Sequence, residues 1–224
     1  MTMWPAKISK PRQANFELLR IVSMIFILIH HCIMFTGQLA PPRTVDQYVI
    51  WLLEIISVTA VNCYVLITGY FLAESTFKIS KVFRLWLQVA FYTVSIGVIG
   101  AFLNVDYICY IRYIVFPIMS NHYWFVSSYL GLFLLSPVLN VFLHGISKHM
   151  FQYLLIVLTL LLCVVSYVSD AYGCNNGFSL IWFIYLYMLA AYMRLYSVSF
   201  RSSSLGMRLA RYFPIQISAG TNRV

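Results

Sequence analysis

Two side chains that could do chemistry lie eleven residues apart in the first long apolar stretch, FELLRIVSMIFILIHHCIMF. They are Arg20 and His31, and ionisable groups are costly inside a bilayer unless they have a function. Eleven residues is close to three helical turns, so both side chains fall on one face of a helix, ~16 Å apart along its axis. Glu17 lies one turn before Arg20 on that face. This spacing predicts a functional stripe through the membrane.

The chemistry that suits this pair is group transfer. The imidazole of His31 can take a proton from a hydroxyl near neutral pH, and we expect its ring to be buried in the helix bundle. The guanidinium of Arg20 suits the phosphate oxygens of a group donor. The alternatives stay open: a histidine bonded to a neighbouring helix, and an arginine that reaches the headgroups. His30 is turned about 100° from His31, so we expect a packing or interface residue there.

A second pair of cations, Lys81 and Arg84, lies where the third apolar run begins. A spacing of three places both charges on one face of a helix, where they could bind a polyphosphate. Lys78 adds a cation one turn earlier. The alternative is that these residues only mark the cytoplasmic side of the span.

Polar and aromatic residues in later runs are candidates for binding an acceptor. Asn62 is a polar residue within an apolar run and could hydrogen-bond across helices, while we expect Gly69 to serve helix packing. Tyr123 and Trp124 begin another run and could stack on a sugar ring, although an interfacial aromatic belt is the alternative. Pro137 lies inside this run, and the carbonyl it frees needs another partner.

Composition places the chain in a membrane. Of its 224 residues, 62% are hydrophobic and 9% are charged, whereas a soluble domain carries about 25% charged residues. The net charge of +9 does not indicate nucleic acid, because the basic residues lie between apolar runs rather than on one basic face. We predict a multi-pass membrane protein, surrounded by lipid and without a nucleic-acid partner.

The apolar runs predict an all-α, polytopic transmembrane helical bundle of about six spans. The expected spans are 16–36, 49–72, 83–103, 122–142, 150–169 and 179–197. With a cytoplasmic N-terminus, the inner segments hold 13 of the 15 basic residues. The positive-inside rule therefore places both termini in the cytoplasm. Segment 104–121 is short and interrupted by charge and proline, so we expect an outer loop there.

Two further features concern the ends and loops of the chain. Residues 199–224 are polar, basic and without periodicity, which predicts a disordered tail after a membrane domain over 1–198. Cys109 and Cys174 fall in expected outer loops, and the sequence leaves open whether they pair. The cysteine spacing is not that of a metal site, so no metal is expected.

Taken together, four segments resemble the acyltransferase family 3 of integral membrane proteins over roughly residues 15–197. FELLRIVSMIFILIHH resembles the first-helix signature, in which arginine is followed after ten residues by histidine, as in Arg20 and His31. NCYVLITGYFL resembles the second-helix segment, and KVFRL resembles the basic pair attributed to CoA binding. HYWFVSSYLGLFLLSPVLN resembles a later helix in which tryptophan is followed thirteen residues on by proline, as in Trp124 and Pro137.

The resemblance implies an enzyme that transfers an acyl group, usually acetyl, from acetyl-CoA to a hydroxyl of a cell-surface carbohydrate or a lipid-linked sugar. The resemblance also implies which residues are catalytic, which bind acetyl-CoA and which bind the acceptor substrate. The catalytic residues would be His31 and Arg20, the acetyl-CoA site would be Lys81, Arg84 and Arg20, and the substrate site would be Tyr123, Trp124 and Asn62.

The chain also departs from the family pattern. Lys81 stands where many members have arginine, and Tyr129 stands where many have a glutamate. Members usually have about ten spans, so the resemblance predicts a C-terminally truncated copy. Two alternatives therefore stay open: an inactive fragment of the acyltransferase, and a transporter or permease-like component, because intramembrane charge also marks transport paths.

Overall fold

The computed structural model describes residues 13–37, 39, 41, 43–103, 123–169 and 172–196, and within these ranges the chain forms helices and no strand. The helices are α1 (Ala14–Phe35), α2 (Val45–Leu72), α3 (Ile79–Phe102), α5 (Trp124–Gly145), α6 (Lys148–Thr159), a π-helical segment (Leu160–Val165), α7 (Ser166–Val168), a short 3₁₀ turn (Asn175–Gly177) and α8 (Leu180–Leu195). Segment 104–121, the 199–224 tail and Cys109 lie outside the described residues.

The all-α, multi-pass prediction is confirmed. Among the described residues, five helices are long and apolar enough to cross a membrane, and one of these runs continuously over Lys148–Val168. Leu180–Leu195 is a shorter apolar helix of 16 residues. The predicted spans agree with these six helices to within about four residues at each end.

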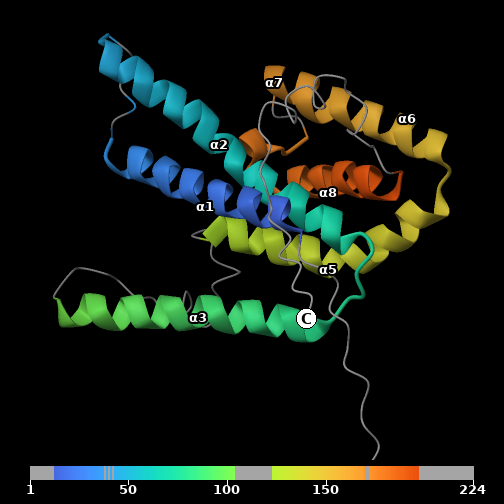
Figure 1. Ribbon diagram of the computed structural model, residues 1–224, viewed down its shortest axis with the longest axis horizontal. Coiled ribbons are helices and arrows are strands. Elements are labelled where there is room, and N and C mark those ends of the chain that lie inside the picture. Colours follow the sequence, from blue (N-terminus) through green and yellow to red (C-terminus); the bar gives the residue numbers. More distant parts are fainter. Residues whose placement is uncertain are drawn as a thin grey trace, which may run out of the picture.

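Two helices form the centre of the bundle (Figure 1). α2 packs against α1 on one side and α8 on the other, and α8 also contacts α5 and α6. The core is built from these contacts, with Val65 of α2 and Phe183 and Tyr187 of α8 almost completely buried. α3 lies along one side of the bundle, at the bottom of the view, and touches it mainly through α5.

The contact between α2 and α8 depends on a glycine, as the sequence predicts. A Cβ atom placed on Gly69 would lie 3.0 Å from Ala190 Cβ and 3.1 Å from Tyr187 Cα. These distances are below an ordinary van der Waals contact, and one partner is backbone. The absence of a side chain at Gly69 therefore allows the two helix backbones to approach closely.

A polar bridge joins three helices near the end of α2. Asn140 of α5 donates through Nδ2 to the Leu72 carbonyl oxygen over 3.2 Å, and its Oδ1 accepts from the Tyr187 hydroxyl. One turn earlier, Pro137 interrupts the hydrogen bonding of α5, and Ser136 Oγ donates to the Phe133 carbonyl over 2.7 Å. The carbonyl freed by Pro137 therefore has a new partner, as predicted.

Replacing Tyr187 by phenylalanine is expected to destabilise the fold by about 1–3 kcal/mol, because the partly buried side-chain oxygen of Asn140, Oδ1, would lose its hydrogen-bond donor. The measurement is thermal unfolding of the chain in detergent. The matched control is Tyr153→Phe, because Tyr153 is 64% exposed. Equal unfolding temperatures for the two variants would show that the bridge contributes nothing.

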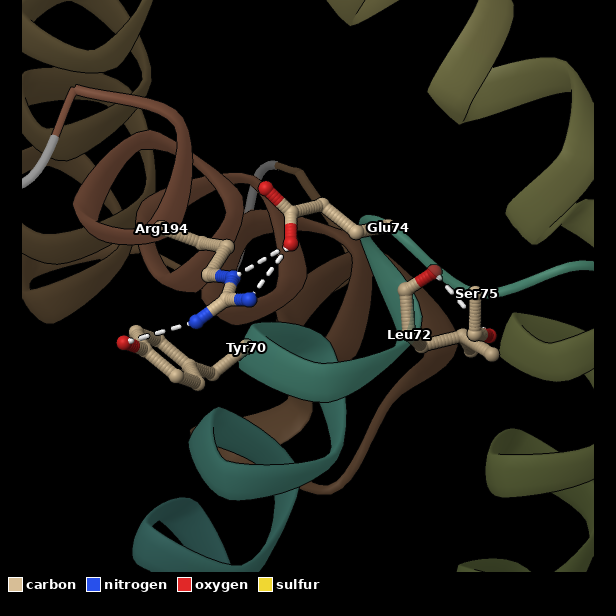
Figure 2. A network of polar contacts seen from close by, with 5 residues as sticks. All are labelled: Tyr70, Leu72, Glu74, Ser75 and Arg194. Carbon is tan, nitrogen blue, oxygen red and sulfur yellow. Dashed lines mark hydrogen bonds and ion pairs between the residues drawn. The ribbon is translucent and has the colours of Figure 1, made fainter. Parts of the chain in front are cut away.

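The ends of α2 and α8 are held together by an ion pair (Figure 2). Arg194 donates to Glu74 through Nε over 2.8 Å and to the Tyr70 hydroxyl through Nη1 over 3.2 Å. Its guanidinium also lies over the Tyr70 ring, 4.9 Å from the centroid. Ser75 Oγ donates to the Leu72 carbonyl over 3.3 Å. These contacts fix the short connection from α2 to the first turn of α3, which carries the second pair of cations.

The helix from Lys148 to Val168 widens into a π-helix at Leu160–Val165. Such segments are rare and are frequent at functional sites. The Cys174 side chain is buried beside it, with Sγ 3.8 Å from the Leu162 carbonyl oxygen. Pairing of Cys174 with Cys109 stays a prediction, since Cys109 lies outside the described part of the chain.

Candidate active site

The cations predicted to bind the donor meet at one cavity. This basic cavity, of about 390 Å³, is lined by Arg20 of α1 and by Lys81 and Arg84 of α3. Thr68, Ser75, Gln88 and Tyr129 add polar groups, and Phe71, Leu72, Val82, Leu85, Leu130 and Phe133 complete the lining. Three fixed positive charges with hydroxyl and amide groups between them form a surface suited to phosphate groups.

Arg20 is held in place by neighbours on two helices. Its Nη1 donates to Glu17 Oε1 over 2.9 Å, and its guanidinium lies 5.4 Å from the centre of the Phe71 ring on α2. Glu17 lies one turn before Arg20 on the same face of α1, and the two side chains form an ion pair. These contacts orient the guanidinium, whose side chain keeps 36% of its surface exposed.

A second cavity, of about 340 Å³, is lined by both histidines of α1. This histidine cavity is also lined by the aromatic side chains of Tyr64 on α2, of Trp124 and Phe125 on α5 and of Phe178. Met24, Ile27, Val58 and Val61 complete the lining. The structure thus brings His31 together with one of the two predicted sugar-stacking residues, Trp124. It places Arg20 and His31 at different cavities on the same helix.

The partition between the two cavities is thin. On α2, Tyr64 lines the histidine cavity and Thr68, one turn later, lines the basic cavity. On α5, Phe125 lines the histidine cavity and Tyr129, one turn later, lines the basic cavity. The two rings stack with their centroids 5.8 Å apart. One turn of each helix, ~6 Å, therefore separates the neighbouring wall residues of the two cavities, whereas Arg20 and His31 lie eleven residues apart on α1, ~16 Å along its axis.

His30 lies at the interface between α1 and α2, as expected, and makes a polar contact there. Its Nδ1 lies 2.7 Å from Oε1 of Glu54, a carboxylate on α2 that is only 9% exposed. The rotation of about 100° that turns His30 from His31 points it at α2, the helix against which α1 packs. Sequence reasoning missed Glu54, although a carboxylate within the apolar run WLLEIIS is the same signal that identified Arg20.

The expected burial of His31 is wrong. Its ring is exposed and stacks at 5.9 Å on Phe35, a residue that is 86% exposed. Among the described helices, α1 packs mainly on α2, the helix that His30 rather than His31 faces. His31 therefore lines the histidine cavity with its ring still exposed.

The three residues predicted to bind the acceptor, Asn62, Tyr123 and Trp124, do not all line one cavity. Asn62 accepts a hydrogen bond at Oδ1 from Trp182 Nε1 over 3.0 Å, so it does bond across helices, from α2 to α8. Together with Trp124, it lines a third cavity of about 350 Å³ beside the π-helix, the amide cavity. The Tyr123 hydroxyl instead accepts from Thr93 of α3 over 3.4 Å. Tyr123 and Trp124 thus face different neighbours.

The part of the chain that the structure describes contains no group of three or more His, Cys, Asp or Glu residues that could hold a metal ion.

Comparison with known proteins identifies the family. The acyltransferase domain of family 3 matches residues 13–219. The chain belongs to acyltransferase family 3. No curated relative and no solved structure matches the chain. As a family-3 acyltransferase it is a multi-pass membrane enzyme that transfers acyl groups, and the plasma membrane is the usual location.

Within this acyltransferase, the position that departs from the family pattern has a place in the structure. Tyr129 lies on the wall of the basic cavity, which Thr68 of α2 also lines. A phenol therefore stands in the partition where many members have a carboxylate. Any proton transfer at this position would need a group other than a glutamate.

Proposed function

We propose that this acyltransferase moves an acetyl group from acetyl-CoA to a hydroxyl of a cell-surface carbohydrate or a lipid-linked sugar. The observation that carries the proposal is the pairing of cavities: three cations line one, two imidazoles line the other, and the walls of the two cavities on α2 and α5 are one helical turn apart. This arrangement would place the phosphates of a donor and the hydroxyl of an acceptor on opposite sides of a thin partition.

The donor would bind with its phosphates at Arg20, Lys81 and Arg84. Arginine and lysine form charge-assisted hydrogen bonds to phosphate oxygens, and these are about twice as strong as neutral ones. The positive-inside pattern of the sequence would open the basic cavity to the cytoplasm, where acetyl-CoA is present. The flexible arm of the donor would then extend past Thr68 and Tyr129 towards the histidine cavity.

The acceptor would enter the histidine cavity from the opposite side of the membrane. The Trp124 ring offers an apolar face for a sugar ring, and the amide cavity beside it adds the polar side chain of Asn62. The base would come from the adjacent histidines His30 and His31, of which the family-like spacing from Arg20 indicates His31. Attack of the hydroxyl oxygen on the thioester carbonyl carbon would transfer the acetyl group while the C–S bond breaks, and the departing thiolate of CoA would take the proton from the imidazole.

The test uses membranes that contain the full chain and acetyl-CoA labelled in the acetyl group. We expect label in the carbohydrate fraction, and we expect the double variant His30→Asn/His31→Asn to lose at least about 100-fold of this transfer, since acid–base catalysis contributes about 10²–10⁴-fold. The matched control is His149→Asn, an exposed histidine at the start of α6. Undiminished transfer by the double variant would reject the assigned site.

A further inference from the structure

The amide cavity and the histidine cavity share a wall. Four residues line both of them: Val58 and Val61 of α2, Trp124 of α5 and Phe178. The Trp124 ring meets the Phe178 ring edge to face, with the two centroids 4.8 Å apart. A molecule that fills the histidine cavity would therefore have the amide cavity directly beside it, and one ligand could extend into both.

The lining of the amide cavity suits an uncharged ring with several hydroxyl groups. Among the described residues that line it, none is Lys, Arg, His, Asp or Glu, so a phosphate or a carboxylate would find no countercharge there. The cavity offers instead two indole rings, two carboxamides and two hydroxyls, from Trp124, Trp182, Asn62, Asn176, Ser166 and Tyr167. Aromatic faces can bury the apolar face of a sugar, and amides and hydroxyls exchange hydrogen bonds with its hydroxyl groups.

One carboxamide of this cavity is already oriented. Asn62 Oδ1 accepts from Trp182 Nε1 over 3.0 Å. That bond uses the acceptor of the amide, so its two N–H donors on Nδ2 can bind a ligand. The Trp182 and Tyr185 rings lie with centroids 5.3 Å apart, and a Cβ on Gly177 would be 3.5 Å from Trp182 Nε1. A donor held in this way binds a ligand hydroxyl with little further loss of side-chain freedom.

Two unfavourable backbone segments meet at the same cavity. Asn175 and Asn176 have φ of 46° and 54°, and they are the only non-glycine residues with positive φ in the part of the chain that the structure describes. Asn176 lines the amide cavity, and so do Leu162 and Cys163 of the π-helix. Left-handed residues and π-helices both cluster at functional sites. Neither segment lines the basic or the histidine cavity, so the proposed transfer site does not explain them.

We propose that the amide cavity is a second sugar subsite, which binds the uncharged ring next to the one whose hydroxyl is acetylated. The inference rests on the proposed function and narrows its substrate class to an acceptor of at least two joined rings. The volume of the amide cavity, about 350 Å³, is within the range of ~300–1,000 Å³ for small-molecule sites. The ring held there determines which hydroxyl of its neighbour reaches the histidine cavity, so a single sugar is a poor acceptor.

The first experiment measures occupancy of the amide cavity without turnover. The probe is the carbohydrate fraction of membranes that contain the full chain, freed of esters by base, partly hydrolysed and separated into uncharged one-ring and two-ring fractions. Cys163 is exposed and lines the amide cavity, so its thiol reports on a ligand there. In the purified full chain, we expect the two-ring fraction at saturation to slow alkylation of Cys163 by iodoacetamide at least about fivefold, and the one-ring fraction to slow it less than about twofold.

The second experiment measures acetyl transfer from acetyl-CoA to the same two fractions. We expect kcat/KM to be at least about tenfold higher for the two-ring fraction, which corresponds to one or two further hydrogen bonds. Cys163→Phe fills the amide cavity and should remove this preference. Asn176→Gly should lower the preference about threefold, because glycine accepts the positive φ and only the carboxamide is lost.

Each measurement has a matched control. Val164→Phe adds the same ring at a residue that is 58% exposed and is not among those that line the amide cavity. Asn175→Gly removes the carboxamide of the other left-handed asparagine, which is likewise not among them. Both variants should keep the two-ring preference within about twofold of the parent value. Cys32, exposed on α1, is the internal control for alkylation, and neither fraction should change its rate.

The outcomes separate this inference from the proposed function. If both fractions are acetylated equally well and neither protects Cys163, the second subsite does not exist and the proposed function stands. If the one-ring fraction protects Cys163 as well as the two-ring fraction does, the amide cavity does not select a second ring and the inference is wrong. If neither fraction is acetylated, the proposed function fails. In that case protection of Cys163 by the two-ring fraction alone still decides whether the amide cavity binds a joined pair of sugars.

Discussion

Replacing Lys81 and Arg84 together by glutamine is expected to weaken acetyl-CoA binding about 100-fold. Both residues line the basic cavity, and both side chains are exposed enough to meet a ligand without prior rearrangement. A hydrogen bond to a charged group contributes about 1.5–3 kcal/mol, and the lower end applies at an exposed site. Two such bonds give about 3 kcal/mol, which corresponds to about two orders of magnitude in Kd.

The measurement is the Kd of acetyl-CoA for the purified chain in detergent, at two salt concentrations. The matched control is Lys78→Gln, because Lys78 lies one turn before Lys81 at the start of α3 and is not among the residues that line the basic cavity. The control should change the Kd by less than about twofold. If Lys78→Gln weakened binding as much as the double variant, only net charge would matter and the cavity would have no role.

Replacing Gly69 by leucine is expected to separate α2 from α8. Even a single Cβ at this position would lie 3.0–3.1 Å from Ala190 and from the backbone of Tyr187, and a leucine adds three further carbons. Overpacking costs about 1–3 kcal/mol where side chains can move, and more where backbone is in the way. We expect a large fall in the unfolding temperature in detergent and reduced accumulation of the protein in membranes.

The matched control for this variant is Gly145→Leu at the end of α5. A Cβ on Gly145 meets no atom within 4 Å, so a side chain there has open space. Its unfolding temperature should stay within a few degrees of the parent value. If Gly69→Leu were equally stable, the close approach of α2 and α8 would not be a determinant of the fold.

Hydropathy predicted the helices well and their rotations poorly. Apolar runs of about 20 residues, bounded by basic or loop residues, specify where each span begins and ends, and the six helices follow them. The rotation of a helix about its axis is different, because lipid tails are as apolar as the protein interior. In α1, apolar residues surround the whole helix, so the sequence did not show that His30 rather than His31 faces α2.

The candidate site could be predicted in part for the same reason. Cations at positions 20, 81 and 84 were identified from their type and spacing, and the structure places all three at one cavity. Glu54 was not identified because its partner comes from another helix, 24 positions away in the chain. Asn62 and Trp182, 120 positions apart, show the same limit: single-sequence periodicity carries no information on which helices are neighbours.

The π-helix determines the direction in which every later side chain of its span points. A wider turn accommodates one extra residue, and each residue of a regular helix advances the side-chain direction by about 100°. Leu162, Cys163, Ser166 and Tyr167 all line the amide cavity, on both sides of the point where the winding changes. Losing one residue from Leu160–Val165 would thus turn Ser166 and Tyr167 out of the amide cavity while leaving the composition of the span almost unaltered.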